Sequence, residues 1–212
     1  MAELLGDVGD APVDLLLETN GGQTDATQAV VTLVQNLTSD FRVIVANAAK
    51  SNGTLLCLAA NRIVMGASSE LGPIEPSVQG IPCTILVQPQ IAQQNFVLHQ
   101  YGHYGLQQSR ALAKSLLAAG MMKGRSQQEI DDAVQKLSSR DVFYSHGSVI
   151  GHAEATTLGL NVEYLPPDNL VWQWIWLLYC MYDHDCRKAR YLKVFEGRLR
   201  STAVAAPPSP AS

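Results

Sequence analysis

Two short glycine-bearing segments contain the residues that could perform chemistry. Segments 20–22 (Asn-Gly-Gly) and 50–54 (Lys-Ser-Asn-Gly-Thr) each follow an apolar, strand-like stretch and precede a helix-like one. Ser51 supplies a hydroxyl, and the glycines allow a substrate strand to approach the backbone closely. A serine at a helix N-terminus, beside N–H groups that stabilise a developing oxyanion, is suited to acyl transfer. The alternative is that both segments are ordinary turns and that Ser51 only caps a helix.

Acyl transfer also needs two hydrogen-bond donors for the oxyanion. We expect one donor to be the backbone N–H of Asn52 or of Gly53, and the other to come from Gly21 or Gly22. Removal of one such donor typically lowers the rate about 100–1000-fold. The prediction therefore requires that the fold bring the two segments together.

The elements around both segments alternate between strand and helix patterns. Apolar runs at residues 13–19, 42–47 and 62–66 are typical of buried parallel strands, and residues 26–37 and 54–60 have helical periodicity. This order predicts right-handed crossovers and an α/β fold whose parallel sheet is covered on both faces.

The second half of the chain is expected to be helical. Residues 90–119 are predicted to form one long or broken helix, with Gly102 and Gly105 interrupting it, and an aromatic helix begins near Leu170. We divide the chain into a main domain at 1–165, a helical extension at 166–200 and a disordered, low-complexity tail at 201–212.

Composition limits the classes of function. The 212 residues are enough for one domain, with 47% apolar residues, 16% charged residues and a net charge of −4. This charge argues against nucleic-acid binding, and the basic stretch 187–200 is interpreted as a solvated surface. The four cysteines have no metal-site spacing, and Cys180, His184 and Cys186 lack a second cluster, so no metal and no cofactor are expected.

Cellular location is inferred from what the sequence lacks. No signal peptide is evident, and the cysteine usage is typical of a reducing compartment, so a cytoplasmic protein is predicted. The aromatic segment 170–182 has 13 residues, against the roughly 20 needed to span a bilayer. We expect it to cover a subunit interface in a homo-oligomer, with peripheral membrane contact as the alternative.

Four segments of the chain resemble a known family. They are residues 13–22 (VDLLLETNGG), 48–54 (AAKSNGT), 58–66 (LAANRIVMG) and 71–76 (LGPIEP). They are similar to the motifs of the serine dehydrogenase proteinase family, which is related to signal peptide peptidase A within the ClpP/crotonase superfold. The resemblance implies a ClpP-like peptidase acting on peptide or protein substrates, with Ser51 as nucleophile and Gly22 and Asn52 as oxyanion-hole donors.

Three asparagines depart from the family pattern. Asn20 replaces a proline of the glycine turn, Asn52 a small residue after the nucleophile, and Asn61 an aspartate. Family members usually carry a further segment, often a membrane anchor, before the first strand. This comparison leaves open whether the chain is truncated or shortened.

The sequence does not identify the base that would activate Ser51. ClpP uses a histidine after its nucleophile, but the corresponding stretch here, 74–76, reads Ile-Glu-Pro. Signal peptide peptidases use a later lysine, and the first lysine after Ser51 is Lys114. His146, in a Tyr-Ser-His-Gly loop, is the other leading candidate. We discount Lys50, because neighbouring side chains at an extended strand end point apart.

The remaining polar candidates have weaker claims. Glu75 could orient a base or close a turn. His99 and His103 share a helical face, where they could form a metal pair or a polar surface, and His152 is a further histidine. Three functions remain: a serine peptidase, a non-catalytic member that binds peptide or a partner through the same cradle, and an acyl-CoA enzyme that would not need Ser51.

Overall fold

A parallel β-sheet forms the centre of the molecule. The structure is a computed structural model that describes residues 11–207. The strand order is β1-β2-β3-β7, with β4 pairing with β2 as the fifth strand. The strands are β1 (Val13–Thr19), β2 (Phe41–Ala49), β3 (Arg62–Met65), β4 (Glu70–Leu71) and β7 (Val162–Tyr164). The mixed α/β fold and its parallel sheet confirm the predicted fold class.

The central strand β2 has two successive neighbours on one side. Its first half pairs with β3, in the register Val43 to Ile63, and its last residues pair with β4, in the register Ala49 to Leu71. This change occurs because β3 has only four residues and β2 has nine. The chain after β4 therefore lies directly beside the C-terminal end of β2, where Ser51 follows.

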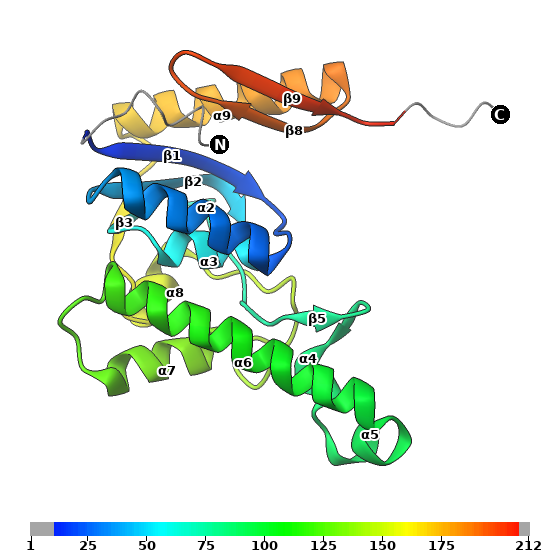
Figure 1. Cartoon of the computed structure of the whole chain (residues 1–212). Coiled ribbons are helices and arrows are strands. Elements are labelled where there is room, and N and C mark those ends of the chain that lie inside the picture. The colour runs from blue at the N-terminus through cyan, green and yellow to red at the C-terminus, as the bar shows by residue number, and fades with distance from the viewer. Residues whose placement is uncertain (1–10, 208–212) are drawn as a thin grey trace.

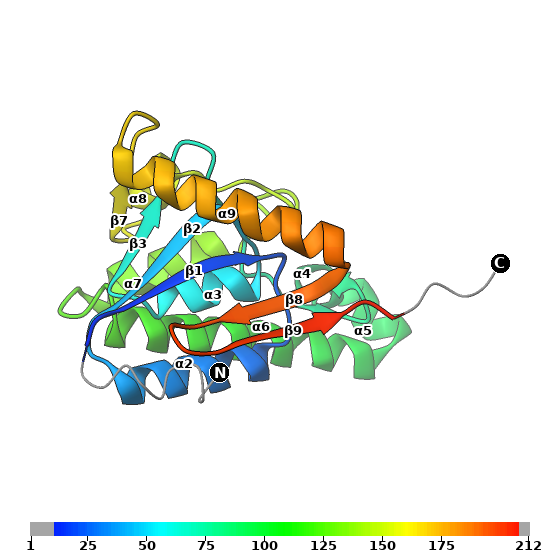
Figure 2. The same ribbon diagram turned by 90° about the horizontal axis from the view of Figure 1, so that it is seen from above.

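Helices cover both faces of the sheet (Figures 1 and 2). On one side lie α2 (Thr24–Leu37), α3 (Asn52–Leu58) and α6 (Phe96–Ala119), with α7 (Gln127–Leu137) packed on α6. The short elements are β5 (Ser77–Val78), β6 (Ile81–Pro82), α4 (Cys83–Leu86), α5 (Pro89–Gln94) and α8 (His152–Thr157). On the other side lies α9 (Leu170–Ala189). Within the described chain, no helix combines the length and the apolar character needed to cross a bilayer.

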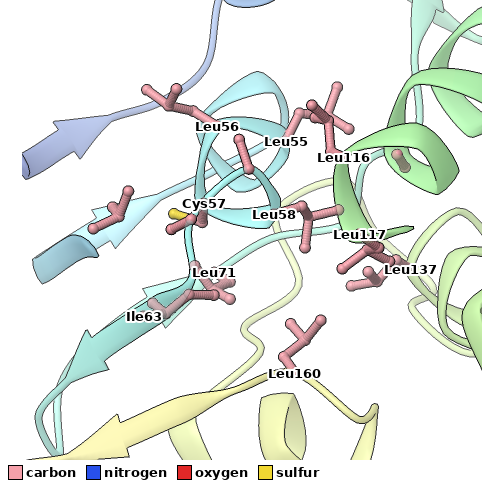
Figure 3. Packing of buried hydrophobic residues seen from close by; sticks show 14 of the residues in the cluster. Leu55, Leu56, Cys57, Leu58, Ile63, Leu71, Leu116, Leu117, Leu137 and Leu160 are labelled. Atoms are coloured by element: carbon pink, nitrogen blue, oxygen red, sulfur yellow. The ribbon is translucent and has the colours of Figure 1, made fainter. Parts of the chain in front are cut away.

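The core holds the helix that follows Ser51. Residues 53–58 of α3 are all buried, and Figure 3 shows this helix among leucines from α6, α7 and the strands. Leu55, Leu58, Leu117 and Leu137 are each at most 2% exposed. Burying one such side chain contributes about 1.5–3 kcal/mol. The N-terminus of α3 therefore has a fixed position relative to the sheet.

The predicted position of the break in the helical segment 90–119 was wrong. The helix break falls at Asn95, between α5 and α6, and α6 runs unbroken through Gly102 and Gly105. These glycines serve close packing instead: a Cβ on Gly102 would lie 2.6 Å from Leu86 Cβ, and one on Gly105 would lie 2.8 Å from Cys83 Sγ, both of α4.

The C-terminal boundaries also differ from prediction. Helix α9 ends at Ala189, and Arg190 adopts a left-handed conformation. An antiparallel hairpin then follows, formed by β8 (Tyr191–Glu196) and β9 (Ser201–Ala205). The expected helical extension is thus a helix and a hairpin, and the start of the expected disordered tail is a strand. The last part of that tail, residues 208–212, lies outside the described residues.

Candidate active site

Ser51 occupies a sharp turn between β2 and α3. Its backbone has φ 54° and ψ −116°, a combination that is costly for a residue with a side chain. The N–H of Gly53 donates to the carbonyl of Lys50 at 2.8 Å. This closes a type II′ turn with Ser51 at the position that usually requires glycine. Strained backbone of this kind is concentrated at functional sites.

Thr54 holds this turn in place from the buried side. Its hydroxyl oxygen lies 2.8 Å from the carbonyl oxygens of both Ala49 and Gly72, which share its single hydrogen, and it accepts from the N–H of Gly72 at 3.0 Å. The side chain is fully buried. One hydroxyl therefore joins the end of β2, the start of α3 and the chain after β4.

The two glycine-bearing segments lie against each other. A Cβ on Gly21 would lie 3.0 Å from Ser51 Cβ and 3.1 Å from the Lys50 carbonyl oxygen. Gly21 also has φ 113°, which side chains rarely adopt. Across the contact, the Asn52 side-chain amide donates to the carbonyl of Gly22 at 2.6 Å. The fold thus brings the two turns together.

Two backbone N–H groups beside Ser51 are free of acceptors within residues 11–207: those of Gly22 and Asn52. The carbonyl of Gly21 accepts from the Thr19 hydroxyl at 3.2 Å. Because carbonyl and N–H point in opposite directions across a trans peptide, the Gly22 N–H is directed away from Thr19. A side chain on Gly22 would meet no atom within 4 Å, so open space adjoins it.

The prediction that the Gly53 N–H could serve as an oxyanion donor was wrong. Its N–H is already bonded to Lys50 within the turn, so it has no hydrogen to offer a substrate. Of the two alternatives that the sequence left open, Asn52 or Gly53, only Asn52 retains a free N–H. The Asn52 side chain acts as a clamp between the turns, and its Oδ1 is buried without a hydrogen-bond partner in the described structure.

Lys50 connects three segments around Ser51. Its ammonium lies 2.7 Å from Glu70 Oε2 and donates to the carbonyls of Leu71 (3.2 Å) and Ser148 (3.3 Å). Its side chain is only 14% exposed. With its hydrogens bound in this way, Lys50 is a structural neighbour of Ser51, consistent with its having been discounted as the base.

The loop that carries His146 is fastened beside the serine turn. Beyond the contact of Ser148 with Lys50, Ile150 and Leu71 exchange backbone hydrogen bonds at 3.0 and 3.1 Å. At the start of the loop, Arg140 Nε lies 2.7 Å from Glu75 Oε2. His146 itself is exposed, and its side chain has no hydrogen bond, ion pair or ring contact to another described residue.

Glu75 is an anchor of this loop and is only 3% exposed. Besides Arg140, the Thr84 hydroxyl donates to its carboxylate. Both of its carboxylate oxygens are thereby bound, which a buried charge requires. Two roles were considered for Glu75, orienting a base and closing a turn. Among residues 11–207, Glu75 binds the loop through Arg140 and has no hydrogen bond to a histidine ring.

Lys114 lies in another part of the molecule. Its ammonium is 2.8 Å from Asp131 Oδ1 on α7, and this hydrogen bond holds the pKa of the Asp131 carboxyl below its usual range. The C-terminal part of α6 runs away from the strand ends that precede the two glycine turns (Figure 1). No contact within residues 11–207 connects Lys114 with Ser51.

The other histidines have separate surroundings. His99 and His103 pack edge to face on α6, with ring centroids 4.6 Å apart. His152 stacks on Tyr164 at 3.9 Å. No three potential metal ligands gather in the part of the chain that the structure describes. The Ser51 hydroxyl likewise has no hydrogen-bond partner there.

Sequence reasoning missed the residues that connect the site. Thr54 and the Lys50 network were not singled out, although Thr54 belongs to the segment that carries Ser51. A buried hydroxyl two residues into a helix, beside a glycine, is a signal that could have suggested Thr54. No local signal could have found the contact of Lys50 with Ser148, because 98 residues separate them.

A parallel sheet, a strained serine turn and a glycine turn with free N–H groups together define a ClpP-like α/β protein. The family model described as "ClpP-like SDH-type serine proteinase" matches residues 6–189, and the chain belongs to that family.

Two proteins of Methanocaldococcus jannaschii are similar to this chain. The uncharacterized protein MJ0137 is 27% identical over 168 residues, which cover 76% of this chain and 57% of that protein. The uncharacterized protein MJ1495 is 29% identical over 79 residues, which cover 37% of this chain and 27% of that protein. The matched part of this chain thus spans little more than half the length of MJ0137 and about a quarter of the length of MJ1495.

Proposed function

We propose that this chain is a serine peptidase in which Ser51 attacks the carbonyl carbon of an extended peptide. The observation that carries the proposal is the packing of Gly21 against Ser51, beside the free N–H groups of Gly22 and Asn52. Membership of a serine proteinase family supports the same reaction class. The positive φ of Ser51 supports it further, because the strain presents the side chain at the end of the sheet.

The reaction has two balanced halves. The Ser51 oxygen bonds to the peptide carbonyl carbon while its proton passes to the base, and the resulting oxyanion accepts from Gly22 and Asn52. Collapse of the tetrahedral adduct breaks the C–N bond, and the base returns the proton to the leaving amine. Water then attacks the acyl-serine by the same route, which releases a carboxylic acid and restores Ser51.

We propose His146 rather than Lys114 as the base. The His146 loop is bound to the residue that precedes Ser51, whereas Lys114 is paired with Asp131 on a different helix. General bases typically contribute about 100–10,000-fold to the rate. His146→Gln should therefore lower kcat by at least 100-fold, and Lys114→Gln by less than threefold.

A non-catalytic, peptide-binding function is the second candidate. Two observations favour it: the Ser51 hydroxyl has no partner among residues 11–207, and the Asn52 side chain is held within the turn. Such a protein would use the Gly22 and Asn52 N–H groups to hold a peptide carbonyl without breaking the bond.

A fluorophosphonate probe separates these functions. We expect covalent labelling of Ser51, located by mass spectrometry, and its loss in Ser51→Ala. The exposed Ser115 on α6 supplies the control, and Ser115→Ala should label as the wild type does. Absence of Ser51 labelling in the folded protein, together with measurable peptide binding, would reject the peptidase in favour of the binding function.

A further inference from the structure

Helix α9 has apolar residues on two opposite sides. Trp172 is 5% exposed and packs over Gly66, where a Cβ would lie 2.0 Å from its ring. At about 100° per residue, the positions of Trp174, Leu178 and Met181 lie opposite Trp172. The exposed apolar residues of this outer side are Leu170, Val171, Trp174, Leu177, Leu178 and Met181, each 45–65% exposed. Seen from above, no other helix or strand of the described chain lies over α9 (Figure 2).

The spacing on this outer side is that of a helix-pairing seam. Val171, Trp174, Leu178 and Met181 are separated by three, four and three residues, the alternation found where two helices pack along each other. A helix that is apolar all round is normally buried. One side of α9 is covered by its own sheet, so the seam needs a second partner.

A hollow of about 300 Å³ adjoins the seam near its C-terminal end. It is lined by Cys180, Met181, His184 and Asp185. The most exposed large side chain of the seam is Trp174, at 63%. Trp174 lies four residues before Leu178, and the hollow is centred about four residues after it.

We propose that α9 pairs antiparallel with α9 of a second copy of this chain, about a two-fold axis at Leu178. Leu178 then meets its own counterpart, and each Trp174 enters the hollow of the other copy. Asp168, in the turn just before α9 and ten residues before the axis, comes near Lys188, ten residues after the axis. Both residues are exposed. A single register of the two helices thus covers the apolar seam, fills each hollow with Trp174 and brings the opposite charges at the helix ends together.

The exposed area fits a dimer. The six exposed apolar side chains on the outer side of α9 expose on the order of 600 Å², the upper end of what one patch of a monomer usually exposes. A standard interface buries about 800 Å² on each partner. The hairpin that packs beside α9 adds Leu192 and Val204, which are 64% and 48% exposed.

A membrane surface fits these residues less well. Interfacial helices that bind bilayers carry lysine and arginine around their apolar side. Here the first basic residues of α9 are Arg187 and Lys188, at its end, and Asp185 lies beside the seam. An exposed carboxylate beside the seam is repelled by anionic lipid headgroups.

The test compares oligomeric state across matched variants, by sedimentation velocity over a range of protein concentrations. We expect a wild-type dimer and a folded Leu178→Asp monomer, with circular dichroism to confirm the fold. Lys188→Glu and Asp168→Lys should each weaken the dimer at least about fivefold, because each places like charges together in two symmetric contacts. The double variant should recover most of the loss.

Lys123→Glu is the matched control, since it makes the same charge change at an exposed position in the turn after α6, away from α9 and the hairpin. It should leave the dimer constant within about twofold. A monomeric wild type, a dimeric Leu178→Asp variant, or a double variant no tighter than the single ones would overturn the proposal. So would a monomer that floats with anionic vesicles in a Leu178-dependent manner, because that result assigns the seam to a membrane.

Discussion

At the scale of single residues, the site depends on two unusual backbone conformations in contact. Ser51 has a positive φ although it carries a side chain, and Gly21 has one that only glycine tolerates well. Neither could change without moving the other, because the two backbones touch. The oxyanion donors of the proposed reaction are thus positioned by sterics rather than by flexible side chains.

Gly21→Ala tests this arrangement. The new methyl group would be forced to a φ of 113° and to within 3.0 Å of Ser51 Cβ. We expect a loss of stability of about 1–3 kcal/mol and a larger loss of Ser51 labelling, measured by urea denaturation and fluorophosphonate reaction. Gly22→Ala is the control for stability alone, since its Cβ would enter the open space beside the proposed oxyanion donors. Equal stability of the two variants would contradict the account.

Lys50→Met tests the residue that holds the His146 loop. The substitution leaves Glu70 without its ion pair and removes the donor to Leu71 and Ser148. Amide hydrogen exchange of Leu71 and Ile150 should accelerate, and peptidase activity should fall about 10–100-fold through misplacement. Lys114→Met is the control, because it also breaks one ion pair of a lysine, the pair with Asp131. It should change neither the exchange rates nor the peptidase activity. Unaltered exchange in Lys50→Met would show that the loop is held by other contacts.

At the scale of elements, the most strongly patterned segments could be predicted from the sequence. Continuous apolar runs predicted β1, β2 and β3. Helix α7 begins at a capping box formed by Ser126 and Glu129, a pattern that a sequence alone can reveal. The β8–β9 hairpin was missed because the basic residues after Arg187 were interpreted as a helix surface. Tyr191, Leu192, Val194 and Phe195 carried a strand signal that outweighs those charges.

The capping box gives a prediction at this scale. Ser126 accepts from the N–H of Glu129 at 3.3 Å, and Glu129 accepts from the Ser126 N–H at 2.9 Å. Ser126→Ala should lower the free energy of unfolding by about 1 kcal/mol in urea denaturation. Val134 and Leu137 keep α7 docked in the core, so the variant should still fold.

The same box should make stability depend on pH. Hydrogen bonds from Ser126, followed by Arg125, lower the pKa of Glu129. A lowered folded-state pKa contributes stability above the unfolded value of about 4.3, and this contribution is lost as the pH falls through the folded value. The stability gap between wild type and Glu129→Gln should therefore be present at neutral pH and close in acid. A gap that stayed constant from neutral pH into acid would contradict this account.

At the scale of the whole molecule, the sequence could not predict what brings the site together. Gly21 meets Ser51 and Gly22 meets Asn52 because β1 and β2 are adjacent and parallel, which the pattern allowed us to expect. The neighbours from residues 140–150 come from a loop whose position depends on Glu75, Lys50 and β4 together. Such contacts depend on packing between distant segments, for which a single sequence has no local signal.

The docking of α9 on the sheet rests on one close approach, and Gly66→Ala tests it. The added Cβ would lie 2.0 Å from the Trp172 ring, so the ring must leave its buried site and α9 must shift with it. Exchange protection should fall at least tenfold in α9 and persist in β2, which keeps its strand pairs with β1 and β3 and its packing against α3. Tryptophan fluorescence should move to the red. Because the proposed dimer seam is the outer side of the same helix, the variant should also dissociate. Gly151→Ala, whose Cβ would meet nothing within 4 Å, should keep both properties, and a Gly66→Ala protein that behaves like it would show that α9 is held elsewhere.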